Sequence, residues 1–124
     1  MPATRPEALD ALFEHYLNAG QVDALVELYE PAAVFVPQPG AMRVGHAAIR
    51  AALEAFVAAR PRLQLHVTQV VSSGDLAILY TDWAGTVTDA DGATQSIAGR
   101  ALEVARRQPD GTWRFVVDDP YARG

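Results

Sequence analysis

Few residues of this chain have side chains that could do acid–base or covalent chemistry from inside a fold. Cys and Lys are absent, which excludes a thiol nucleophile, a thiolate metal site and a Schiff base. The three His residues are scattered without an HExxH spacing, so no metal site is predicted. The remaining candidates are Asp118 and Asp119 directly before Pro120, His66 in an apolar-rich segment, and Arg100. Either Asp could supply a carboxylate or simply end a strand, and His66 could be an acid or base or a core histidine.

The elements that must position these residues follow from the apolar periodicity. Helical spacing predicts helices over 6–19, 21–29 and 45–59. A short strand is predicted over 33–36, followed by an irregular loop over 37–40, and long strands are predicted over 63–71, 76–88, 94–107 and 112–119. Short connections rich in turn formers join the long strands, which indicates an antiparallel meander. The chain of 124 residues is therefore predicted to be one α+β domain, with three N-terminal helices on one face of a curved antiparallel sheet.

Strand register decides which side chains share a face of this sheet. Symmetric pairing about each turn puts Thr88 opposite Ala93 and Arg107 opposite Thr112. One face then collects His66, Thr68, Leu79, Thr81, Trp83, Arg100, Leu102, Val104, Trp113, Phe115, Val117 and Asp119. We assign this face to the concave, helix-covered side, because it holds both Trp residues and most of the bulk. A single β-bulge would exchange Asp119 for Asp118, so both stay candidates.

The expected pocket has aromatic walls and polar members drawn from this face. Its walls are Trp83, Trp113 and Phe115, with Tyr16 and Tyr29 reaching in from the helices. His66, Arg100 and one of the two Asp residues are its polar members. The two Trp side chains could also be ordinary core residues.

The opposite face of the sheet is also largely apolar and needs a cover of its own. Parity places Leu65, Ile78, Tyr80 and Ile97 there. A second copy of the chain is the natural cover, so we expect a homodimer.

Composition excludes several classes of partner. The net charge of -5 opposes binding to a phosphate backbone, so no nucleic-acid partner is expected. No run approaches the length of apolar residues that crosses a bilayer, and residues 1–10 carry charges where a signal peptide would be apolar. We therefore expect a cytoplasmic protein without membrane contact.

Three stretches of the chain resemble the SnoaL-like, nuclear transport factor 2-like superfamily. Residues 23–35 (DALVELYEPAAVF) resemble its helix-to-strand entry, as does Gly45 followed by Ile49 and Arg50. Residues 106–118 (RRQPDGTWRFVVD) are similar to the closing hairpin of its ketosteroid-isomerase-like branch. The resemblance covers nearly the whole chain in the right order and implies a cystatin-like, cone-shaped fold.

The resemblance also implies a chemistry. In the isomerase-like branch, an Asp in an apolar cavity abstracts a proton next to a carbonyl while a neutral donor stabilises the enolate. Carried over to this chain, Asp118 or Asp119 would be the base and Tyr16 or His66 the donor. The substrate would contact Trp83, Trp113, Phe115, Tyr29 and Arg100. No cofactor is implied. The alternative is a non-catalytic module that binds an apolar ligand or dimerises, because the fold hosts both kinds of protein.

Overall fold

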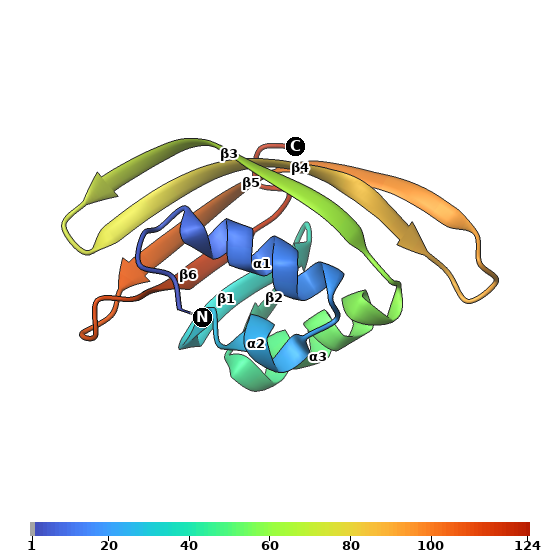
Figure 1. The fold of residues 1–124 in the computed structure, drawn as a ribbon, viewed down its shortest axis with the longest axis horizontal. Coiled ribbons are helices and arrows are strands. Elements are labelled where there is room, and N and C mark those ends of the chain that lie inside the picture. Colours follow the sequence, from blue (N-terminus) through green and yellow to red (C-terminus); the bar gives the residue numbers. More distant parts are fainter. Residues whose placement is uncertain (1) are drawn as a thin grey trace.

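The computed structural model describes residues 2–124 and has a mostly antiparallel sheet that curves around a helix (Figure 1). The helices are α1 (Ala8–Asn18), α2 (Val22–Val26) and α3 (His46–Ala58). The strands are β1 (Tyr29–Gln38), β2 (Ala41–Val44), β3 (Arg62–Ser73), β4 (Leu76–Thr88), β5 (Thr94–Arg107) and β6 (Trp113–Asp119). The α+β class and the four long strands of the meander are confirmed.

The sequence prediction was wrong about the first part of the sheet. Tyr29 does not end a helix but begins β1, which runs on to Gln38 through the stretch expected to be a loop. β1 turns back into β2 and pairs in parallel with β6, so the described sheet has six strands in the order β2-β1-β6-β5-β4-β3. Gly40 has φ +80°, a conformation that favours Gly and that closes this hairpin. The three helices are therefore interrupted by the β1–β2 hairpin instead of preceding the whole sheet.

The register of the long strands differs by one residue from symmetric pairing. Thr88 pairs with Thr94, and Arg107 pairs with Trp113. Each turn ends in a Gly with φ +84°, Gly92 and Gly111, which is the left-handed position of a G1 bulge. The bulge adds one residue to the loop, and because side chains alternate, one residue reverses the faces of the next strand.

Two further bulges lie inside the strands. The pairing of β3 with β4 shifts between Val67 and Gln69, and that of β6 with β5 shifts around Val116. The β6 bulge means that Phe115 and Asp118 are both buried although their spacing is odd. It exchanges Asp119 for Asp118 on the inner face.

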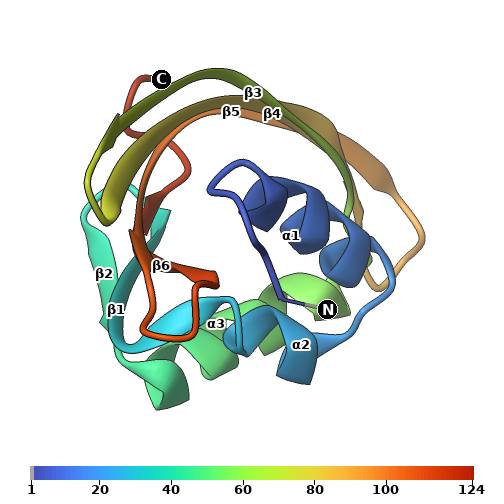
Figure 2. The same ribbon diagram turned by 60° about the vertical axis from the view of Figure 1, so that its left-hand side comes forward.

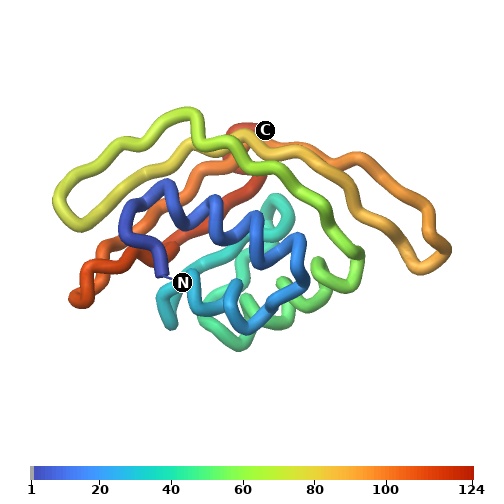
Figure 3. Tube along the Cα trace, viewed as in Figure 1, coloured from blue at the N-terminus to red at the C-terminus, as the bar shows by residue number. Residues whose placement is uncertain are grey.

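The core lies on the concave side of the sheet, and the helices cover it (Figure 2). The sheet wraps around α1, whose side chains Leu9, Phe13 and Leu17 are buried. α3 packs below against β1 and contributes Ile49 and Leu53. Both ends of the long β3–β4–β5 meander extend past the helices as hairpins (Figure 3). The helices fill the middle of the concave face and leave room beside them.

Candidate active site

A cavity of about 640 Å³ opens between α1, α3, the β1–β2 hairpin and the concave face of the sheet. This volume falls in the range of roughly 300–1,000 Å³ that is usual for small-molecule sites. Its walls are mostly apolar. They include Phe13, Phe35, Ala52, Ala55, Phe56, Leu63, Leu65, Trp83, Val87, Ile97, Ala101 and Tyr121.

Three carboxyl groups interrupt the apolar lining of this cavity. They belong to Asp10 of α1, Glu103 of β5 and Asp118 of β6, and each residue is at most 5% exposed. Glu103 and Asp118 are direct cross-strand partners. No basic side chain among the described residues bonds to any of the three. A buried carboxylate without a cation is costly, so protonation is the expected response.

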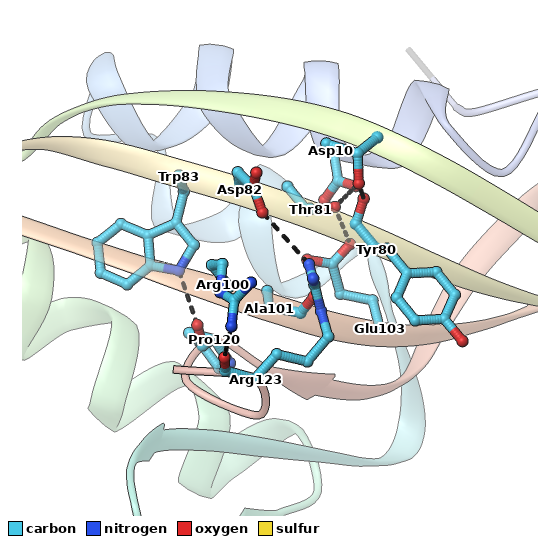
Figure 4. Close-up of polar contacts among 11 residues, drawn as sticks. Asp10, Tyr80, Thr81, Asp82, Trp83, Arg100, Ala101, Glu103, Pro120 and Arg123 are labelled. Carbon is cyan, nitrogen blue, oxygen red and sulfur yellow. Dashed lines mark hydrogen bonds and ion pairs between the residues drawn. The ribbon is translucent and has the colours of Figure 1, made fainter.

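Thr81 of β4 lies between two of these carboxyls (Figure 4). Its hydroxyl oxygen is 3.0 Å from Oδ2 of Asp10 and 3.1 Å from Oε1 of Glu103. A hydroxyl has a single hydrogen and can donate to only one of them. The other contact is favourable only if that carboxyl is protonated and donates to Thr81. The geometry therefore requires a proton on the Asp10–Glu103 pair.

Electrostatics agree with a shared proton on this pair. Burial raises the pKa of Glu103 well above its usual range, and the charge of Asp10 adds to this effect. Burial also raises the pKa of Asp10, against hydrogen bonds from Glu103 and Thr81. Oδ1 of Asp10 is buried and has no hydrogen-bond donor among the described residues. A neutral acid at this place supplies a hydrogen-bond donor beside an otherwise apolar cavity.

Asp118 is held by Tyr29. The Tyr29 hydroxyl donates to Oδ2 of Asp118 over 2.5 Å, and the structure gives the other oxygen no protein partner among residues 2–124. Burial raises the pKa of Asp118 to about 7, although the hydrogen bond from Tyr29 opposes the rise. Burial and the neighbouring Asp118 charge raise the pKa of Tyr29 well above its usual value, so this phenol stays a donor. Asp118 therefore carries a carboxylate of near-neutral basicity.

The structure brings some of the predicted site residues together. Trp83 and Asp118 line the cavity, and Tyr29, which is not part of the lining, donates a hydrogen bond to Asp118. The Trp83 indole donates from Nε1 to the carbonyl of Pro120 over 2.8 Å (Figure 4). Its ring packs edge-on against Tyr121. Trp83 and Trp113 are both buried on the concave side, as expected. The extra residue in each of the two turns, before β5 and before β6, reverses the face of the strand that follows. The two reversals cancel for Trp113, which therefore lies on the predicted face.

His66 and Arg100 do not lie in the cavity, so their predicted placement was wrong. His66 pairs with Asp82 and is exposed on the convex face. The bulge between Val67 and Gln69 shifts the pairing of β3 with β4 by one residue, and this shift reverses the face on which His66 lies. Arg100 on β5 is the other cross-strand partner of Asp82, and its side chain donates a hydrogen bond to the carbonyl of Arg123 (Figure 4). The G1 bulge before β5 reverses its face relative to the symmetric pairing.

Other expected pocket residues lie in the core or outside. Phe115 packs edge-on against Phe13 and does not line the cavity. Trp113 lies at the far end of β6, next to the N-terminal segment, and is not a wall either. Tyr16 is half-buried on α1 beside the His15 ring, outside the cavity lining. Asp119 pairs with Leu102 and points away from Asp118.

The expected dimer face also needs correction. Leu65 and Ile97 line the cavity on the concave side, because of the same bulges. Ile78 and Tyr80 remain on the convex side, where the ring of Tyr80 lies 5.2 Å from the Arg123 guanidinium.

Sequence reasoning missed the carboxyls of Asp10 and Glu103. A signal existed for both. Asp10 lies three residues before Phe13 and seven before Leu17, on the apolar side of a helix. Glu103 stands between Ala101 and Ala105 on one face of a long strand. A charged side chain among apolar ones on the same face of a helix or strand indicates a functional residue more strongly than the apolar side chains do.

Two other kinds of feature are absent from the described part of the chain. Within residues 2–124, no group of three or more His, Asp or Glu side chains is placed to hold a metal ion. No helix in the same range is long and apolar enough to cross a membrane.

Comparison with solved structures supports the fold. A ketosteroid isomerase-like protein from Erwinia carotovora atroseptica is 21% identical over 90% of this chain and 88% of its own, with a TM-score of 0.82. A protein of the nuclear transport factor 2-like superfamily from Salmonella enterica serovar Typhimurium is 20% identical over 94% of this chain and 89% of its own, with a TM-score of 0.76. These identities show the shared fold alone.

A third structure shows how varied such proteins are. A protein from Thiobacillus denitrificans, assigned as a calcium/calmodulin-dependent protein kinase type II association domain, is 25% identical over 96% of this chain and 94% of its own, with a TM-score of 0.77. Comparison with curated proteins gives no match. The SnoaL-like domain family matches residues 9–119, nearly the whole chain. Because this match spans the curved sheet, the enclosed helix and the residues that line the cavity, the chain belongs to the SnoaL-like family.

Proposed function

We propose that this protein binds a small, mostly apolar carbonyl compound in the cavity and moves a proton on it, with Asp118 as the base. The observation that carries the proposal is the setting of Asp118. Its carboxyl is buried in an apolar cavity and anchored by Tyr29 through one oxygen, and it has a pKa of about 7. A base of this pKa is effective at neutral pH, because much of it is ionised and it still binds a proton well.

The proposed step is proton abstraction next to the carbonyl. The free oxygen of Asp118 takes the proton from the carbon, the C–H electron pair forms a C=C bond, and the carbonyl electrons move to oxygen. The resulting enolate needs a hydrogen-bond donor. Glu103 is the cross-strand neighbour of Asp118, and its protonated carboxyl would supply the donor by turning its proton from Thr81 to the enolate oxygen. Return of the proton from Asp118 to the same carbon leaves the ketone unchanged apart from proton exchange. In a ketone whose C=C bond is conjugated with the enolate, return of the proton to the far carbon of that bond completes an isomerisation without an oxidant or reductant.

The experiment uses exchange with solvent, which needs no knowledge of the natural substrate. Apolar aryl ketones such as β-tetralone are first screened for a rise in melting temperature, because a ligand that binds the folded state stabilises it. Loss of the α-proton signal in deuterium oxide is then followed by NMR. We expect the wild-type protein to accelerate exchange above buffer, and Asp118→Asn to remove this acceleration while ketone binding persists.

Asp119→Asn is the matched control, because it changes the adjacent carboxyl that points away from Asp118. Its exchange rate should stay within about two-fold of the wild type, as for a surface substitution. Equal exchange by Asp118→Asn and the wild type would contradict the proposal. Ketone binding without exchange would support instead a non-catalytic binding protein.

We also propose that the convex face of the sheet is covered by a second copy of the chain. Ile78, Tyr80, Leu102 and Val104 share this face and are only partly buried by their own chain. Light scattering that reports only monomer at high micromolar concentration would contradict it.

A further inference from the structure

We propose that the ligand is amphipathic and carries an anionic group, a carboxylate, that Arg43 binds at the mouth of the cavity while the apolar, reacting end lies at the buried carboxyls. This rests on the proposed ligand-binding role of the cavity but not on catalysis. It assigns Arg43 as a specificity-determining residue.

Arg43 faces the cavity because of the β1–β2 hairpin. It is the cross-strand partner of Phe35, and partners in a ladder project to the same side of the sheet. Phe35 is a buried wall of the cavity, and Arg43 also lines it. Gln38 on the same hairpin lines the mouth as well and offers an amide donor. The hairpin thus places a cation and a neutral donor on one rim.

Arg43 is not used by the fold in the way most other arginines are. Its hydrogen bond to the carbonyl of the adjacent Met42, at 3.3 Å, is long and exposed. No acidic partner of Arg43 is found among residues 2–124. Arg residues in ion pairs include Arg5, Arg50, Arg106, Arg107, Arg114 and Arg123. A guanidinium free of acidic neighbours, with a planar fork of donors, suits a carboxylate from outside.

The charges of the cavity dictate how such a ligand would lie. Among the described lining residues, Arg43 is the one basic side chain, and it is exposed, whereas Asp10, Glu103 and Asp118 are buried. Phe35 lies between Arg43 and Asp118 in the sheet, because it is the cross-strand partner of both. An anion pushed to the deep end would be desolvated beside these carboxyls, which is strongly unfavourable. The carboxylate therefore stays at the rim, in contact with water, and the apolar part fills the space between. The two ends of opposite polarity select one orientation.

Affinity for matched pairs of ligands tests this inference. Naphthylacetate, naphthylpropionate and naphthylbutyrate are compared with their primary amides, which keep the shape and remove the charge. We expect the wild type to prefer at least one carboxylate over its amide, and Arg43→Gln to weaken that carboxylate roughly five-fold, as for an exposed ion pair. Amide binding should change by less than about two-fold, and Arg43→Lys should keep part of the preference.

Arg5→Gln is the control, because it removes the same charge from an exposed residue outside the cavity lining. It should leave the carboxylate preference intact, and added salt should reduce the preference in the wild type. No carboxylate preference for any pair, or equal losses for acid and amide in Arg43→Gln, would overturn the inference. A selective loss in Arg43→Gln combined with no ketone exchange would keep the Arg43 site and refute the proposed catalysis.

Discussion

Replacing Asp118 by Asn should stabilise the protein at high pH. Burial raises the pKa of this carboxyl from its ordinary 3.8 to about 7, so the folded state holds its proton more tightly than the unfolded state. Below about pH 4 the Asp118 carboxyl is protonated in both the folded and the unfolded state, so it does not reduce the free energy of unfolding. As the pH rises, the unfolded state ionises first, and stability falls until the folded state ionises as well near pH 7.

The size of the effect follows from the two pKa values. The difference between 3.8 and about 7, at about 1.4 kcal/mol for each pKa unit, corresponds to about 4 kcal/mol lost by about pH 8. Asn is neutral at every pH and keeps an oxygen that can accept from Tyr29. We expect Asp118→Asn to be more stable than the wild type by up to about 4 kcal/mol at about pH 8 and by little at about pH 4.

Urea denaturation at several pH values measures this directly. The free energy of unfolding of Asp118→Asn minus that of the wild type should rise between about pH 4 and pH 8. Asp119→Asn should show a much smaller rise, because its side chain points away from the site and its charge contributes least among the causes that raise the pKa of Asp118. A difference that does not depend on pH would refute the reasoning, since a carboxylate in contact with bulk water has no such penalty.

Three further substitutions test the surroundings of the site. Thr81→Val should lower the free energy of unfolding by about 1–3 kcal/mol, because it removes the hydroxyl between two buried carboxyls; urea denaturation checks this. Tyr29→Phe removes the hydrogen bond that lowers the pKa of Asp118, so the acid limb of the pH dependence of ketone exchange should move to higher pH. Gly99→Ala would place a Cβ 2.6 Å from Cζ2 of Trp83, so it should shift the tryptophan fluorescence and cost about 1–3 kcal/mol of stability in urea denaturation.

The long strands could be predicted because local chemistry decides them. β4 and β5 begin and end where the sequence predicts, since turn formers flank each of them. β1 was largely missed, because Pro37 and Pro39 indicate a loop to a local reading. Pro is tolerated at a bulge, and Pro37 lies at the irregularity between Phe35 and Gln38. β1 forms because β6 and β2 pair with it.

The candidate site was predicted in part. Trp83, Tyr29 and Asp118 were named from sequence and meet at or beside the cavity. His66 and Arg100 were named as well and lie on the other face. Whether the predicted face was right depends on the number of bulges that the prediction overlooked, because every bulge reverses the face to which the following side chains point.

The sequence by itself determined the three helical regions, the four long strands, the meander and the family, because periodicity, turn residues and motifs are local properties of a chain. Only the tertiary structure decided which carboxyl faces inward. The left-handed Gly92 and Gly111 and the bulge at Val116 set that choice, through backbone hydrogen bonds between strands. It also decided that Asp10 meets Glu103, because a helix and a strand that are distant in the sequence pack together. Their shared proton exists only in that packed arrangement, where burial makes two adjacent charges too costly.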